Sequence, residues 1–194
     1  MQYRLTNQHK LYTRIDTGQQ DKTMRTKALH RNARLAITVG LTIYGGIIMS
    51  DFEVFRLLDN VDLAIHETGH IIFTPFGEFM HFLGGTLLQL IFPLAFVLYF
   101  LRQGDRHAAT VPLWWLGQNC WNIARYVADA RAQELPLVGG GIHDWNFLLG
   151  RMGLLSQDVS IGNTIEKIGV GIFFFSVAAG MATFSAIPKP AKVG

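Results

Sequence analysis

The segment His66-Glu67-Thr68-Gly69-His70 carries side chains whose types and spacing suit hydrolytic chemistry at a metal ion. A turn of α-helix takes about 3.6 residues, so His66 and His70 project from one helix face and can bind the same zinc ion. Glu67 lies beside that face, where it can take a proton from a water molecule at an open metal position. The segment stands in an apolar run, where ionisable side chains are costly and usually functional. The pattern predicts a zinc-binding helix; the alternative is that neighbouring side chains of a helical bundle satisfy these three residues structurally.

A zinc site needs a third protein ligand, and one candidate lies on a later helix. Four polar residues there are spaced four, three and four apart, which places them on one face of an otherwise apolar helix: Gln118, Asn122, Arg125 and Asp129. Such a stripe faces a cavity, a partner or a metal. Asp129 would complete a site of two histidines and one carboxylate. The alternative is a pairing of Asp129 with Arg125 or Arg131 near the membrane surface.

A glycine-rich turn further along the chain offers the alternative third ligand. Gly139-Gly140-Gly141 precedes His143 and Asp144, and such a turn can fold back onto the motif helix. Either residue could be a ligand, orient a metal-bound histidine or stabilise the transition state. The structural alternative is that Asp144 caps the helix that follows it, with Trp145 anchored at the membrane interface.

Two other residues close to the motif are also candidates for the third ligand. Glu78 and His81 follow the motif, but Pro75 and Gly77 interrupt the helix between them, so spacing does not give their direction. Phe76 stands where the metzincin pattern requires a histidine, which excludes that class of metalloprotease.

The composition indicates where this chemistry would take place. Apolar residues make up 49% of the chain and charged residues only 16%, and the apolar residues are grouped in long blocks. We therefore predict an all-α, polytopic integral membrane protein, a bundle of about five transmembrane or membrane-embedded helices. The blocks cover about residues 35–50, 82–101, 108–128 and 167–187, with the motif helix at about 60–75 as the fifth. This fifth helix is short and polar, so we expect the others to shield it from lipid.

The first 34 residues form a basic tail without an apolar core, which is not the pattern of a cleavable signal peptide. By the positive-inside rule this tail, residues 1–34, predicts a cytoplasmic N-terminus. We interpret its charge as a topology signal near anionic lipid headgroups and not as a nucleic-acid-binding element.

Residues 35–194 are predicted to form a single membrane domain, with a glycine-rich loop insertion at about 135–163. Within it, Gly139-Gly140-Gly141 would end the fourth helix region and Pro188 to Pro190 the last helix. Cys120 is the only cysteine, which excludes an intrachain disulfide and a thiolate zinc cluster.

The HETGH helix, the glycines Gly84-Gly85 and the later asparagine and aspartate together resemble the site-two protease family of intramembrane zinc metallopeptidases. In that family an aspartate in the pattern Asn-x-x-Pro-x-x-x-x-Asp-Gly is the third zinc ligand. Residues 122–129 form a version one residue shorter, with Arg125 in place of the proline and Ala130 in place of the glycine. The resemblance covers about residues 60–130 and is specific at HETGH.

The resemblance implies one zinc ion held by the two motif histidines and Asp129, and hydrolysis of peptide bonds in or near the lipid bilayer. The substrate would be a membrane protein or peptide. Glu67 would act as general base and then return the proton to the leaving amine. Asn122 or His143 would donate a hydrogen bond to the oxyanion. We expect the protein in the bacterial inner membrane.

The main alternative is a non-catalytic accessory subunit of a larger respiratory or photosynthetic membrane complex. Histidines within a membrane can bind haem or chlorophyll, and four are candidates for such contacts: His66, His70, His81 and His107. That role would not require Glu67. A proton-relaying transporter is a third possibility, although the sequence has no repeated half that would support it.

Overall fold

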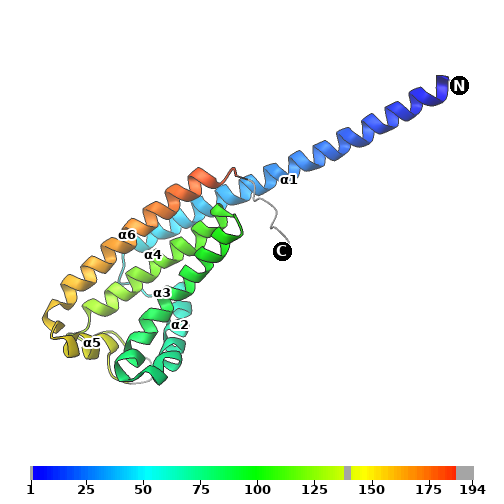
Figure 1. The fold of residues 1–194 in the computed structure, drawn as a ribbon. Coiled ribbons are helices and arrows are strands. Elements are labelled where there is room, and N and C mark those ends of the chain that lie inside the picture. Colours follow the sequence, from blue (N-terminus) through cyan, green and yellow to red (C-terminus); the bar gives the residue numbers. More distant parts are fainter. Residues whose placement is uncertain (1, 138–140, 187–194) are drawn as a thin grey trace.

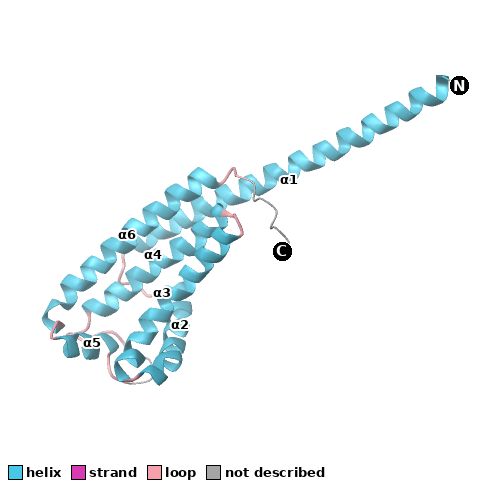
Figure 2. Cartoon of the chain, in the orientation of Figure 1, coloured by secondary structure: helices cyan, strands magenta, loops and turns pink. Residues whose placement is uncertain are grey.

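The computed structural model describes residues 2–137 and 141–186, and this part of the chain contains helices and no strand (Figures 1 and 2). The main helices are α1 (Gln2–Ser50), α2 (Leu57–Phe73), α3 (Glu78–Arg102), α4 (Arg106–Ala128), α5 (Asp144–Met152) and α6 (Asp158–Thr183). Two short 3₁₀ turns join them, η1 (Thr74–Phe76) and η3 (Leu155–Gln157). The all-α prediction is confirmed. The fourth helix, predicted to end at Gly139-Gly140-Gly141, ends earlier, at Ala128. The last helix ends at Thr183, before Pro188 to Pro190, which lie outside the described residues.

Helix α4 lies at the centre of the bundle and packs against α6 on one side and α3 on another, while α2 packs against α3 (Figure 1). Trp114 and Trp121 on α4, Phe173 on α6 and Ile48 on α1 form the apolar core of this arrangement. The N-terminal half of α1 extends beyond the bundle (Figure 1).

Three helical segments are long and apolar enough to cross a membrane: Lys22–Ser50, Glu78–Arg102 and Leu155–Thr183. The predicted count of about five is therefore not confirmed in the described residues. Helix α4 forms where a span over about 108–128 was expected, but it is not one of the three. Its inward positions carry Gln118 and Asn119, which are buried against the surrounding helices. A central helix of this kind is covered by protein and does not need an apolar surface.

Helix α2 has its polar face inside and its apolar face outside. Asp62 is fully buried and His66 is 7% exposed, whereas Leu57 and Ile71 are 85% and 74% exposed. This is the reverse of a soluble amphipathic helix and is expected of a helix that borders lipid. We expected the other helices to shield α2 entirely; they shield only its polar face.

Glycines let α2 and α3 approach closely. A Cβ atom on Gly69 would lie 2.2 Å from the carbonyl oxygen of Gly84, and one on Gly85 would lie 2.5 Å from Nε2 of His66. The chain reverses between the two helices through Pro75 in η1 and Gly77, whose φ of 98° favours glycine. These residues bring the start of α3 against the motif helix.

The helix boundaries add detail to the predicted segmentation. The part of the predicted tail that the structure describes and the first predicted span lie on one continuous helix, α1. The predicted loop insertion at 135–163 contains α5 and the start of α6, which begins at Asp158 and not near residue 167. Asp158 accepts hydrogen bonds from the Arg131 side chain and from the backbone N–H of Val159, which fixes this early start.

Gly69→Ala should destabilise the protein, since the added methyl group meets the α3 backbone. Overpacking of this kind costs about 1–3 kcal/mol. Thermal unfolding in detergent measures the change. Gly171→Ala, on the open surface of α6, is the matched control and should cause no loss. Equal stability of Gly69→Ala and wild type would contradict the close helix contact.

Candidate metal centre

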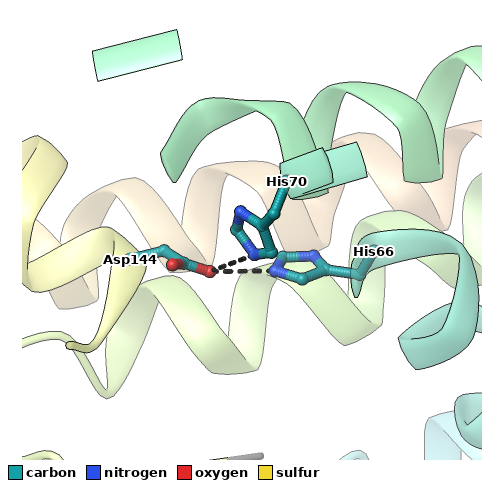
Figure 3. Close-up of side chains that lie close together, drawn as sticks. All are labelled: His66, His70 and Asp144. Carbon is teal, nitrogen blue, oxygen red and sulfur yellow. Dashed lines mark hydrogen bonds and ion pairs between the residues drawn. The ribbon is translucent and has the colours of Figure 1, made fainter. Parts of the chain in front are cut away.

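The two motif histidines and Asp144 converge on one point (Figure 3). His66 and His70 project from the same face of α2, and their ring centroids lie 4.7 Å apart. The Nε2 atom of His66 lies 2.9 Å from Oδ2 of Asp144, and the Nε2 atom of His70 lies 3.2 Å from the same oxygen. Asp144, at the start of α5, is therefore the carboxylate that the fold brings to the histidines.

The other ring nitrogen of each histidine faces an oxygen acceptor. Nδ1 of His66 lies 3.1 Å from Oε1 of Gln89, and Nδ1 of His70 lies 2.8 Å from the backbone oxygen of His81. Because these oxygens only accept, the hydrogen of each neutral ring is placed on Nδ1. Two Nε2 lone pairs and a carboxylate oxygen then face one another, and a cation between them would relieve their repulsion. Metal-binding histidines typically donate their other ring N–H to an oxygen acceptor in this way.

A chain of hydrogen bonds fixes the orientation of Gln89. The amide of Gln89 donates to Oδ1 of Asn122 at 2.9 Å, and the Asn122 amide donates to Oδ1 of Asp59 at 3.2 Å. The carboxylate of Asp59 can only accept, so each amide in the chain has one orientation. Asn122 was predicted to donate to an oxyanion, but here its amide supports His66 through Gln89.

Contacts with the Tyr126 hydroxyl help to position Asp144. The backbone N–H of Asp144 donates to the Tyr126 hydroxyl at 3.2 Å, and that hydroxyl lies 3.5 Å from Oδ2 of the same residue. Burial alone would raise the pKa of Asp144, but hydrogen bonds from His66 and His70, which require protons on their Nε2 atoms, outweigh burial and lower the pKa. A bound metal ion would take the place of those protons. The carboxylate is thus charged at neutral pH, as a metal ligand must be.

Asp129 was the other candidate for the third ligand, but the contacts of its carboxylate within the described residues do not include His66 or His70. It follows the last residue of α4, and its carboxylate accepts hydrogen bonds from the backbone N–H groups of Glu134 and Leu135 at 2.9 and 3.1 Å. Its Oδ2 also lies 3.4 Å from Nε2 of His143. Neither Arg125 nor Arg131 forms an ion pair with Asp129 in the described part of the chain; Arg131 pairs with Asp158. Asp129 therefore organises the turn that leads to Asp144.

His143 is buried beside the site and does not line the cavity, described below, onto which the two motif histidines open. Its Nδ1 accepts a hydrogen bond from the backbone N–H of Asn146, so His143, and not Asp144, caps α5. Its ring stacks on Tyr126 with centroids 4.2 Å apart. Burial lowers the pKa of His143, which favours the neutral ring that this cap requires. The geometry gives His143 a positioning role and not the predicted contact with an oxyanion.

The remaining histidine and glutamate candidates occupy different places. Glu67 lines the same cavity as the two motif histidines. The ring of His81 lies 5.1 Å from that of His70, and its Nδ1 is 2.9 Å from the Thr74 hydroxyl. Glu78 is largely exposed near Arg151. His107 is buried 3.1 Å from the Thr38 hydroxyl, between α1 and α4.

A cavity of about 680 Å³ opens onto the metal-ligand cluster. Its walls come from α2, α3, α4 and the segment before α5, and they are mainly apolar with a few charged groups. Leu135, Pro136 and Leu137 border it in an irregular, non-helical stretch. The space is large enough for a peptide segment.

Two residues of the site were not predicted. Gln89 is the only amide within the apolar block of α3, a signal that marks it as functional. Tyr126 lies four residues after Asn122, on the same face of α4, so the polar stripe itself could have identified it.

Comparisons with protein-family models, with curated proteins and with solved structures found no match to this chain.

Asp144→Ala should abolish zinc binding, because it removes the ligand that faces both Nε2 atoms. Elemental analysis of purified protein should find about one zinc per wild-type chain and almost none in Asp144→Ala, His66→Ala or His70→Ala. Asp129→Ala should retain zinc at saturating concentration but unfold at a lower temperature. Zinc retained by Asp144→Ala and lost by Asp129→Ala would reverse this assignment.

Gln89→Met should keep the zinc stoichiometry but weaken zinc affinity by about 10–100-fold, because the His66 ring loses the acceptor that orients it. Competition with a chromogenic zinc chelator measures the affinity. Gln103→Met, on the exposed end of α3, is the control and should bind zinc as wild type does. Unchanged affinity in Gln89→Met would remove Gln89 from the site.

Proposed function

We propose that this chain is a membrane-embedded zinc metallopeptidase that hydrolyses peptide bonds in or near the bilayer, with Glu67 as general base. The observation that carries the proposal is the convergence of two imidazole Nε2 atoms and one carboxylate, with both Nδ1 hydrogens already committed. Glu67 opens onto the same cavity. Two histidines, one carboxylate and an adjacent glutamate are the residue types of open, catalytic zinc sites.

The spacing of the three ligand atoms suits zinc. Bonds of about 2.1 Å to a tetrahedral zinc hold ligand atoms roughly 3.4 Å apart. The observed separations of 2.9 and 3.2 Å from the Asp144 oxygen need only a small outward shift. The general base beside the ligands favours zinc over open-sited iron, which uses the same ligand types.

Zinc bound there would lower the pKa of a coordinated water towards neutrality and polarise the peptide carbonyl. Glu67 takes the proton of the attacking water and passes it to the leaving amide nitrogen. Tyr126 replaces the predicted Asn122 and His143 as the donor to the developing oxyanion. Its hydroxyl is only weakly engaged by Asp144 at 3.5 Å, and Tyr126 lines the cavity.

The apolar outer faces of α2, α3 and α6 support a location within the bilayer. The basic residues in the first part of α1 favour a cytoplasmic N-terminus, in the bacterial inner membrane. The resemblance to the site-two protease family then no longer includes the third ligand, because the carboxylate beside the histidines is Asp144 and not Asp129. The substrate would be a membrane protein or peptide whose chain unwinds to enter the cavity.

Glu67→Gln should bind zinc normally but lose about 10²–10⁴-fold in proteolytic rate, since a neutral amide cannot accept the proton. The assay incubates purified protein with detergent-solubilised membrane proteins and counts new N-termini by mass spectrometry. Glu78→Gln, an exposed glutamate outside the cavity, is the control and should retain full activity. Wild-type protein that carries zinc but cleaves no more than Glu67→Gln would contradict the peptidase and favour an accessory subunit.

A further inference from the structure

Arg125 lines the candidate active-site cavity, and its guanidinium group has no carboxylate partner among the described residues. Its Nη1 atom donates to the backbone oxygens of Phe52 and Glu53 at 3.3 and 2.8 Å, and its Nε atom is buried without a hydrogen-bond partner. No ion pair involves Arg125 within the described residues. Arginine in an apolar bundle is costly, and it typically marks a ligand path when it faces a cavity.

The cavity's own acidic groups do not neutralise Arg125. Asp144 is engaged by the motif histidines, and Asp59 accepts from the amides of Gln118 and Asn122. Glu53 is exposed and accepts from Arg125 through its backbone oxygen, and neither Glu53 nor Glu67 forms an ion pair with Arg125 within the described residues. The guanidinium therefore keeps both its charge and donor capacity for a ligand in the cavity.

Arg125 is also close to the residues that shape the metal centre. It lies between Asn122, which supports His66 through Gln89, and Tyr126, which holds Asp144. All three line the same cavity. A ligand that reaches the histidines can therefore extend along α4 to the guanidinium.

We propose that Arg125 is a specificity-determining residue that binds a carboxylate of the substrate, so that the preferred substrates are acidic peptides. The carboxylate belongs either to an aspartate or glutamate side chain or to a free C-terminus. Guanidinium groups bind carboxylates by charge-assisted, often bidentate hydrogen bonds. This inference rests on the proposed function, because it assigns the substrate class of the same site.

The test uses matched pairs of small zinc-binding hydroxamates. Monohydroxamates of malonic, succinic, glutaric and adipic acid carry a free carboxylate at increasing distance, and their terminal amides are the neutral partners. Binding to zinc-loaded, detergent-purified protein is measured by calorimetry. In wild type, at least one acid should bind about tenfold or more tightly than its amide. This advantage should disappear in Arg125→Gln and persist in part in Arg125→Lys.

Arg56→Gln is the matched control variant. Arg56 also holds the loop between α1 and α2 by donating to the backbone oxygens of Val54, Ile47 and Asp51, but it does not line the large cavity. The carboxylate advantage should therefore survive in Arg56→Gln. If Arg125 only held the loop, both variants would unfold at lower temperature and neither would change the acid-to-amide ratio.

The remaining outcomes separate this inference from the peptidase proposal. Equal affinity for acid and amide in wild type at every chain length overturns the carboxylate site alone, since binding of the amide still reports a working metal centre. Failure of every compound to bind overturns both proposals. Four peptides then identify whether the bound carboxylate is a side chain or a free C-terminus. They carry Glu or Gln at the centre and an acid or an amide at the C-terminus, and they compete for cleavage in one reaction. A preference for either acid supports the inference, and no preference contradicts it.

Discussion

A series of hydrogen bonds that begins at Asp59 fixes which ring nitrogen of His66 carries the hydrogen. The geometry of the site depends on this series. Because the Asp59 carboxylate only accepts, Asn122 must turn its amide nitrogen towards Asp59 and its oxygen towards Gln89. Gln89 then presents its oxygen to the imidazole, whose hydrogen is placed on Nδ1 and whose Nε2 lone pair faces Asp144. Helices α2, α3 and α4 each contribute a member, so the chain is satisfied only when all three are packed together. In an apolar bundle, the loss of one of these hydrogen bonds would leave buried polar atoms unpaired. The hydrogen bonds therefore stabilise the packing of the three helices, and the packing stabilises the hydrogen bonds.

Because α2 and α3 approach closely, the side-chain amide of Gln89 on α3 can reach the ring of His66 on α2. Gly69 and Gly84 place two backbones in contact, and Gly85 leaves the room that the His66 ring occupies. The exposed face of α2 is apolar, so in lipid its polar residues are satisfied only inside the bundle. The glycines therefore serve the site as much as the fold: they bring the inward polar face of α2 within hydrogen-bonding distance of α3.

Apolar blocks predicted the positions of α2, α3 and α4 within a few residues, and the HETGH spacing correctly predicted a helix with both histidines on one face. The choice between Asp129 and Asp144 was harder for a physical reason. A four-three-four spacing gives direction only while the helix continues, and α4 ends at Ala128, one residue before Asp129. The direction of Asp129 is set by backbone amides of the following turn, which no periodicity encodes. His143 was likewise placed by its cap on α5, a local contact that competes with any role in the cavity.

Asp144 is the one member of the ligand cluster that does not lie on α2, and its position is determined at the end of α4. Asp129 holds the turn after α4, and Asn146 donates to the backbone oxygen of Ala130 in the same turn. Tyr126 stacks on His143 and accepts from the backbone of Asp144. The carboxylate is therefore presented by contacts made to α4, while the histidines are oriented by contacts made to α3. Since α4 packs against α3, the two halves of the site are held in register by a helix pair that contributes no ligand to the cluster. A metal held there would thus depend on residues such as Asp129 and Gln89, which position the ligands without being ligands themselves.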